Sequence, residues 1–264
     1  MVALRKPTGN AMKYERVRAA CVFTCFTGLL LAGAAFAAEP AARYVQGPAT
    51  PDGIGKRYMG REIARVMGWQ AAPWLEREER EQEERTSLLI QELNLKPGMV
   101  VADVGAGSGY LSRRMAPLVA PGGRILAVDI QPEMLALLAK VAEDPRYSNI
   151  EPVQGAADDT HLPAGSVDLA IMVDVYHELE FPWEVLESIV HALKPGGRVA
   201  FVEYRGEDPA VPIKELHKMT ERQVRLEAAA HALTWERTGK RLPWQHLVVF
   251  RKQDPAGSAL PVVP

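Results

Sequence analysis

Short apolar runs alternate along the middle of the chain with segments in which apolar residues recur at helical spacing. The apolar runs predict strands over residues 99–105, 124–130, 149–155, 166–176 and 198–204. The helically spaced segments predict helices over residues 110–120, 132–144 and 182–197. Strict alternation of strand and helix predicts βαβ units with right-handed crossovers, and so an α/β domain whose parallel sheet is covered on both faces.

A charged stretch, residues 74–93, precedes the first of these strands and predicts a helix by propensity. Its acidic and basic residues recur at i,i+4 spacing, as in Glu76 with Arg80 and Glu81 with Arg85. Such pairs are typical of a solvated helix face, so this charge run needs no functional explanation.

The segment after the last strand departs from plain alternation. Residues 212–232 predict a long helix, and residues 233–241 and 244–252 predict two strands of a hairpin. A terminal hairpin would add one antiparallel strand to a doubly wound parallel sheet. Residues 74–252 then form one domain, and residues 253–264 form a C-terminal tail.

Residues 38–73 are rich in Pro, Gly and Ala and predict a loop-rich segment without a domain of its own. Residues 57–69 predict a short helix that covers the following domain. Four polar and aromatic residues in this segment or directly after it are candidates to close over a ligand: Tyr58, Arg61, Trp69 and Trp74. Alternatively, the two tryptophans only pack this segment onto the core.

The N-terminal region predicts export. A basic stretch, residues 12–18, precedes an uncharged apolar run over residues 19–38, and Ala35-Phe36-Ala37 has the arrangement of a cleavage site. Residues 1–37 are therefore expected to be a secretory signal, which places the mature protein in the periplasm or outside the cell. Because about 20 apolar residues also suffice to cross a bilayer, an uncleaved membrane anchor is the alternative. A start at Met12, or translation from further downstream to give a cytosolic protein, also remains open.

Composition limits the classes of function. The 264-residue chain has a formal net charge of −2, and removal of residues 1–37 would make it about −6, which gives no electrostatic reason to expect nucleic-acid binding. Both cysteines, Cys21 and Cys25, lie in the predicted signal. A mature chain therefore has no disulfide, no cysteine nucleophile and no thiolate metal ligand.

The candidate chemistry begins at a glycine-rich turn after the first predicted strand. Gly105, Gly107 and Gly109 have the spacing G-x-G-x-G, and Tyr110 stands where the dinucleotide-binding fingerprint has its third glycine. This departure disfavours a nicotinamide-dependent oxidoreductase. Asp103 lies inside the apolar strand, where a carboxylate is costly unless it has a partner such as a cationic amino group.

Four motifs in order resemble the class I S-adenosylmethionine-dependent methyltransferases over residues 85–250. They are VADVGAGSG at 101–109, AVDI at 127–130, GAADDTHLP at 155–163 and LKPGGRVAFVE at 193–203. The resemblance implies an α/β fold with a doubly wound, mostly parallel seven-stranded sheet, helices on both faces and a C-terminal antiparallel hairpin. It also implies S-adenosyl-L-methionine as the cofactor.

Roles for individual residues follow from the resemblance. Asp103 would neutralise the ammonium of the cofactor, Asp129 would accept hydrogen bonds from both ribose hydroxyls, and Asp158 would face the adenine. The full set implied to bind cofactor is Asp103, Gly105, Gly107, Gly109, Asp129, Ile130, Asp158 and Asp174. Relatives have glycine where this chain has Ala157, which leaves open whether Asp158 or Asp159 faces the adenine.

The acceptor side of the site is expected after the fourth strand, because ligands bind at the carboxyl ends of strands in open α/β sheets. Four polar residues lie there: Asp174, Tyr176, His177 and Glu178. His177 is the candidate general base, with a purely structural histidine as the alternative.

Further candidates come from the strand end and the segment that follow. Glu178 and Glu203 complete the predicted catalytic set, although Glu203 could instead hold a helix terminus, and Tyr204 lies on the same rim. His217 and Lys218 are candidates to frame the acceptor. No cluster has the spacing typical of a metal site, so no metal is expected.

These observations predict an enzyme that transfers a methyl group from S-adenosylmethionine to a small molecule. The general outline resembles the ubiquinone and menaquinone biosynthesis methyltransferases more than enzymes acting on proteins or nucleic acids. A non-catalytic ligand-binding or scaffold protein on the same fold is the alternative, and an NAD-dependent oxidoreductase is disfavoured. Membrane association through residues 19–38 is the only other partner expected from the sequence.

Overall fold

The computed structural model describes residues 42–254. The predicted signal or anchor and most of the predicted tail lie outside the described residues. Within residues 42–254, no helix combines the length and the apolar character needed to cross a membrane.

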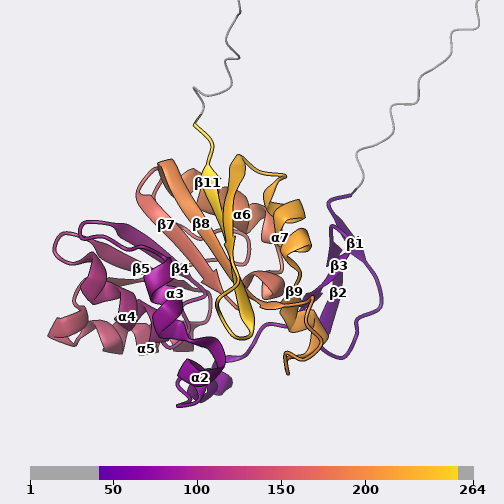
Figure 1. Ribbon diagram of the computed structural model, residues 1–264, viewed down its shortest axis with the longest axis horizontal. Coiled ribbons are helices and arrows are strands. Elements are labelled where there is room, and N and C mark those ends of the chain that lie inside the picture. The colour runs from indigo at the N-terminus through magenta and orange to yellow at the C-terminus, as the bar shows by residue number, and fades with distance from the viewer. Residues whose placement is uncertain (1–41, 255–264) are drawn as a thin grey trace, which may run out of the picture. The chain divides into compact units, whose positions relative to one another are not determined.

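A central sheet organises the domain, with strand order β10-β11-β8-β7-β4-β5-β6 (Figure 1). Its strands are β4 (Val100–Val104), β5 (Arg124–Asp129), β6 (Ile150–Gln154), β7 (Val167–Val173), β8 (Leu193–Arg205), β10 (Leu233–Gly239) and β11 (Gln245–Lys252). Neighbours from β6 to β8 pair in parallel, and β11 lies antiparallel between β8 and β10. A short strand, β9 (Lys218–Met219), also pairs with β8. The predicted α/β class, the parallel sheet and the antiparallel terminal hairpin are therefore confirmed.

The strands are apolar on both faces because each face packs against helices. In β7, Leu169 and Ile171 belong to one buried cluster, whereas Ala170 and Met172 belong to the other. This period of two assigns successive side chains to opposite layers. Two covered faces therefore explain why the strands form continuous apolar runs in the sequence.

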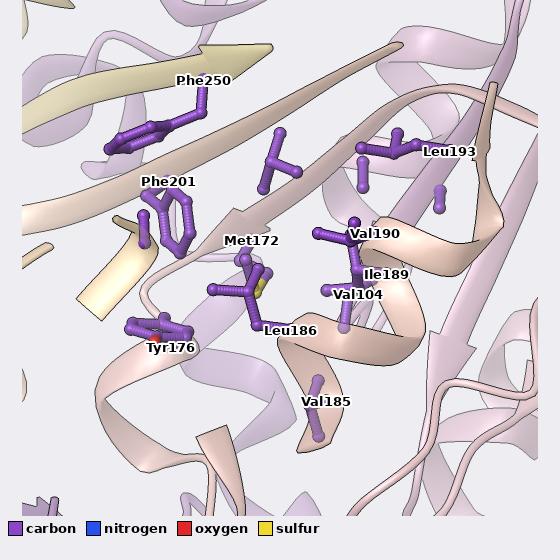
Figure 2. Packing of buried hydrophobic residues seen from close by; sticks show 14 of the residues in the cluster. Val104, Met172, Tyr176, Val185, Leu186, Ile189, Val190, Leu193, Phe201 and Phe250 are labelled. Carbon is purple, nitrogen blue, oxygen red and sulfur yellow. The ribbon is translucent and has the colours of Figure 1, made fainter. Parts of the chain in front are cut away.

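Helices supply the outer layers on both sides. On one face lie α6 (Pro182–Ala192) and α7 (Glu221–Ala228), and on the other lie α3 (Thr86–Glu92), α4 (Tyr110–Val119) and α5 (Pro132–Ala142). Figure 2 shows Leu186 of α6 beside Met172 of the sheet, and Phe201 close to Phe250. The Phe201 ring meets the rings of Tyr176 and Phe250 edge to face, with centroids 4.9 and 5.6 Å away.

The N-terminal segment differs from its prediction. Residues 57–69 contain no α-helix, and the segment forms a three-stranded antiparallel sheet of β1 (Tyr44–Gln46), β2 (Gly53–Tyr58) and β3 (Arg61–Ala64). Met59 and Gly60 have positive φ angles of 44° and 95°, which reverse the chain tightly between β2 and β3. This two-residue hairpin turn overrides the helical spacing of the apolar residues. Figure 1 shows the small sheet beside α7 and β9.

Two segments that were each predicted as a single helix divide into several shorter elements. Residues 74–93 divide among α1 (Ala72–Leu75), α2 (Arg80–Glu84) and α3, with Arg85 at φ 51° between the last two. Instead of facing solvent, Arg80 and Glu84 are buried, and the Arg80 Nε donates to Glu84 Oε2 at 2.7 Å. Residues 212–232 also form no single helix. They contain η4 (Glu215–His217), β9 and α7, and the Thr220 side chain caps the N-terminus of α7.

One buried ion pair joins the N-terminal sheet to the main domain. Arg61 of β3 donates from Nε to Glu227 Oε1 of α7 at 2.7 Å, and from its terminal nitrogens to the carbonyls of Tyr176 and His177. The Glu227 side chain is fully buried. Arg61 therefore holds together three elements that are far apart in the sequence.

We expect Arg61→Met to lower the free energy of unfolding by about 3–5 kcal/mol, because the buried Glu227 carboxylate would lose its cation. Urea denaturation measures this loss. Arg124→Met, which removes an exposed ion pair with Glu151, is the matched control and should cost about 1 kcal/mol or less. The double variant Arg61→Met/Glu227→Gln should regain at least half of the loss. An Arg61→Met variant as stable as the Arg124→Met control would contradict this assignment.

Candidate active site

A cavity of about 480 Å³ lies at the carboxyl edge of the central sheet. Gly105 follows β4, Asp129 ends β5, Asp174 follows β7 and Tyr204 belongs to the end of β8, and all four line the cavity. This is the edge at which open α/β sheets bind ligands. The strand order therefore brings together residues that the sequence separates widely.

The glycine-rich turn forms one wall of this cavity. The amides of Gly105 and Ala106 both donate to the Val128 carbonyl, at 2.8 and 3.0 Å, which fixes the turn against β5. Gly107 has φ 56°, and a Cβ there would lie 2.7 Å from the Leu75 side chain. Gly105 and Gly107 line the cavity as predicted, because the turn requires residues without a side chain.

Gly109 has a different place. Its φ is 78°, it precedes the first residue of α4, and a Cβ there would lie 2.9 Å from Leu138 of α5. It lies outside the cavity wall. Glycine at position 109 allows the start of α4 to pack closely against α5. The prediction that Gly109 binds cofactor is therefore not supported.

Asp129 is the best anchored of the predicted cofactor ligands. Its Oδ2 accepts from the Gly107 amide and its Oδ1 from the Gln131 amide, each at 2.9 Å. Burial raises the pKa of this carboxyl above its ordinary value, and the backbone hydrogen bonds oppose that rise. Ile130, the next residue, also lines the cavity. Asp129 therefore both organises the turn and presents a carboxylate to the cavity.

Of two further aspartates predicted to bind cofactor, Asp174 lines the cavity and Asp103 does not. Asp103 lies beneath the glycine turn and outside the cavity wall, and its Oδ2 accepts from the Ser112 hydroxyl at 2.6 Å. Burial raises the pKa of Asp103 to about 6, against the lowering effect of Ser112 and of the Arg80 guanidinium. The predicted contact between Asp103 and the cofactor ammonium is therefore not supported, because motif spacing does not give the depth of a side chain below the cavity.

Asp174 instead presents a buried carboxylate oxygen at the cavity wall. Its Oδ2 accepts from the Gln245 side chain at 2.7 Å, and its Oδ1 is buried without a hydrogen-bond partner among residues 42–254. Burial, with the nearby Glu84 and Glu203 carboxylates, raises the pKa of Asp174 well above its ordinary value. An orphaned oxygen at this place fits a cofactor that brings a cationic or hydrogen-donating group.

The structure also separates the two candidates for the adenine contact. Asp158 is exposed and lies outside the cavity wall, whereas Asp159 lines the cavity and fixes the local loop by accepting from the His161 amide at 2.8 Å. Of the two residues left open by the sequence, Asp159 is therefore the one that lines the cavity, and the predicted Asp158 does not.

The predicted catalytic residues form a connected cluster. His177 Nδ1 lies 2.6 Å from Glu203 Oε2, and the other Glu203 oxygen accepts from the Tyr176 amide at 3.0 Å. His177 Nε2 lies 3.2 Å from His217 Nδ1, and Glu178 Oε1 also lies 3.2 Å from His217 Nδ1. The His177 and Glu178 pair comes from one short helix, η3 (Tyr176–Glu178), and His217 comes from η4.

The carboxylates beside His177 counteract the effect of burial on its pKa. Burial alone would lower the pKa of His177, but the Glu203 and Glu178 carboxylates raise it to about 10. The role of His177 as a general base stays a prediction. Glu203 is fully buried and lies outside the cavity wall, so it positions η3, which is the alternative role left open for it by the sequence.

Several other candidates are placed by the structure. His217 and Trp74 line the cavity, as the sequence suggested for residues framing a ligand. Lys218 is buried and pairs with Glu215 at 2.9 Å outside the cavity wall. Tyr58, Arg61 and Trp69 also lie outside the wall, so only Trp74 of the four closing candidates contacts the cavity.

One part of the cavity lining, which we call its roof, was not predicted from the sequence. The residues of the roof are mainly apolar and come from β2, β3 and the segments that follow β3 and precede η4: Ile54, Ala64, Val66, Met67, Pro212 and Ile213. The Met67 amide also donates to Glu178 Oε2 at 3.0 Å. One sequence signal for this roof was a short alternation of small and large residues in 53–56, which the loop-like composition concealed.

Comparisons with known proteins agree with this geometry. Residues 102–201 match the sequence model of a methyltransferase domain family. The chain is 28% identical over 116 residues to a ubiquinone/menaquinone biosynthesis C-methyltransferase of Ectopseudomonas mendocina, which covers 44% of this chain and 45% of the relative. It is 33% identical over 125 residues to protein-L-isoaspartate O-methyltransferase 1 of Arabidopsis thaliana, with 42% and 49% covered. The chain thus spans about half the length of these curated relatives.

A solved structure extends the likeness beyond the matched segment. The crystal structure of a SAM-dependent methyltransferase from Aquifex aeolicus superposes with a TM-score of 0.66 over 71% of this chain and all of that chain, at 22% identity. At this identity the likeness concerns the fold.

The buried Asp103 carboxyl gives the ligand-free protein a measurable pH dependence. Because its folded-state pKa is raised to about 6 from 3.8, ionised Asp103 opposes folding, and its unfavourable contribution grows as pH rises from about 4 through 6. We expect Asp103→Asn to be more stable than the parent by about 2–3 kcal/mol at pH 8 and nearly equal at pH 4.

Urea denaturation of both chains at the two pH values measures this difference. Asp158→Asn, at an exposed aspartate, is the control and should show no such change. A stability difference for Asp103→Asn that is the same at both pH values would refute the assignment.

Proposed function

The chain carries a class I S-adenosylmethionine-dependent methyltransferase domain, and on that premise we propose that it methylates a small molecule held in the same cavity as the cofactor. S-adenosylmethionine supplies an electrophilic methyl group on a sulfonium. The chain's own residues bind this cofactor, hold the acceptor in line with it and exclude water, and such positioning provides much of the rate.

The residues present fit this cofactor. Gly105 and Gly107 allow the backbone to approach a ligand closely, and the Asp129 carboxylate at the end of β5 is placed to accept hydrogen bonds from ribose hydroxyls. The unpaired Oδ1 of Asp174 is the group that best suits a cationic amino group. All of these residues line the cavity.

The observation that carries the proposal is the roof over this cavity. Ile54 and Met67 from the N-terminal sheet and its exit, together with Ile213 before η4, line the same cavity as Asp129 and Asp174. A volume of about 480 Å³ is within the range of small-molecule sites. Apolar groups on this roof favour an acceptor with an apolar body, and a cavity of this size favours a small molecule over a folded protein.

Calorimetric titration tests the cofactor half of the proposal. We expect the full chain to bind S-adenosylmethionine and its demethylated product but not NAD, because Tyr110 replaces the third glycine of the dinucleotide fingerprint. Asp129→Ala should weaken binding by about 1–3 kcal/mol, the range for a buried hydrogen-bonding group left without its partner. Asp158→Ala is the matched control and should bind like the parent.

Measurement of turnover tests whether the methyl acceptor is a small molecule. Formation of demethylated cofactor is followed with a panel of small apolar phenols and thiols and, separately, with an isoaspartyl peptide. The proposal expects turnover with at least one small molecule and none with the peptide. Cofactor binding without any turnover would support the non-catalytic alternative, and turnover with the peptide alone would overturn the small-molecule acceptor.

We also propose that residues 1–37 direct export. The support is the order of a basic stretch, an apolar run and Ala35-Phe36-Ala37 in the sequence. Alkaline phosphatase fused after Pro264 should be active, because it requires a compartment outside the cytoplasm. The variant Leu30→Arg/Leu31→Arg, which interrupts the apolar run, should abolish that activity.

A cleaved signal and an uncleaved anchor both place the domain outside the cytoplasm. The mass of the purified chain then distinguishes them, because only cleavage removes residues 1–37. A cytosol-only reporter that is active at the same position, with a chain that begins at Met1 or Met12, would refute export.

A further inference from the structure

Three side chains on the cavity wall point one ligand atom each toward a common centre. His177 Nε2 lies 3.2 Å from His217 Nδ1, His217 Nδ1 lies 3.2 Å from Glu178 Oε1, and Glu178 Oε1 lies 3.7 Å from His177 Nε2. All three residues line the cavity. Two imidazole nitrogens and one carboxylate oxygen are a donor set used for catalytic divalent metals.

The dimensions of this triangle suit a small transition-metal ion. For metal–ligand bonds of about 2.1 Å, tetrahedral geometry separates ligand atoms by about 3.4 Å and octahedral geometry separates adjacent ones by about 3.0 Å. The three distances of 3.2, 3.2 and 3.7 Å lie around the tetrahedral value. The ligand atoms would therefore need little movement to accept an ion.

A second layer of hydrogen bonds already orients two of the three ligands. Glu203 Oε2 lies 2.6 Å from His177 Nδ1, which leaves Nε2 as the nitrogen that faces the cavity. The Met67 amide donates to Glu178 Oε2 at 3.0 Å, which leaves Oε1 as the free ligand atom. A carboxylate behind a histidine and a donor behind a carboxylate are the supports that metal ligands have in proteins.

We propose that His177, Glu178 and His217 form a site for one divalent transition-metal ion, with Zn²⁺ as the best fit, whose remaining coordination position faces the cavity. Three protein ligands with one open position is the arrangement of catalytic rather than structural zinc sites. The donor set has two imidazoles and only one carboxylate, so it disfavours Ca²⁺ and Mg²⁺, which prefer oxygen ligands.

Resting on the proposed function, this site selects the class of acceptor. A hydroxyl or thiol bound at the open position loses its proton to solvent more easily, which removes the need for His177 as a base. The freed electron pair forms the bond to the methyl carbon, and the carbon–sulfur bond of the sulfonium breaks with its electron pair left on sulfur. The inferred acceptors are therefore small alcohols, phenols or thiols.

Metal binding is tested without reference to turnover. The full chain carrying Cys21→Ser and Cys25→Ser, which removes its only thiols, is titrated with Zn²⁺ by calorimetry and with Co²⁺ by visible absorption. We expect one ion per chain and a Co²⁺ spectrum of tetrahedral intensity without a thiolate band. His217→Ala should weaken binding at least 100-fold, because one of three protein ligands is lost.

Two further variants keep the test informative. Glu178→Gln keeps the size of the side chain and should also weaken binding at least tenfold, whereas His191→Ala removes an exposed histidine of α6 and should leave binding unchanged. Absence of stoichiometric binding, or equal binding by the parent and His217→Ala, would overturn the site. Calorimetric binding of S-adenosylmethionine by the same samples separates this failure from failure of the proposed function.

Discussion

The site depends on one carboxylate that never contacts the cavity. Glu203 is fully buried near the end of β8, where it must have hydrogen-bond partners, and it finds them in the backbone amide of Tyr176 and the ring of His177. From the other side, Arg61 donates to the carbonyls of Tyr176 and His177. The short helix η3 is thereby fixed between two charged groups of opposite sign, and the direction of His177 and Glu178 follows from that restraint.

The elements that the sequence predicted are those in which local pattern and global packing agree. Strands β4 to β8 are apolar throughout because helices cover both faces, and the alternation with helices leaves few topologies to choose from. The prediction of a single helix over residues 74–93 was wrong for the opposite reason, because distant residues determine how this segment packs. Glu84 accepts from Arg77, Arg80 and the Tyr204 hydroxyl, a partner 120 positions away, and no local window contains that information.

The position of a site residue could be predicted where a backbone turn fixes its side chain. Elsewhere the sequence contained less information about where the side chain lies. Asp129 follows from its place at a strand end beside the glycine turn, whereas the depth of Asp103 and the unpaired oxygen of Asp174 depend on how the strand ends lie around the cavity. The meeting of His217 with His177 joins η4 to η3 across 40 positions, so spacing gave no sign of a ligand cluster.

The roof over the cavity lies in a different part of the sequence from its base. Ile54, Met67 and Ile213 all fall outside residues 102–201, the segment that matches the methyltransferase domain family. One cavity is therefore lined partly by the matched segment and partly by stretches of chain on either side of it. The residues outside the matched segment can differ between relatives that share it, without any change in the glycine turn or in the strand ends.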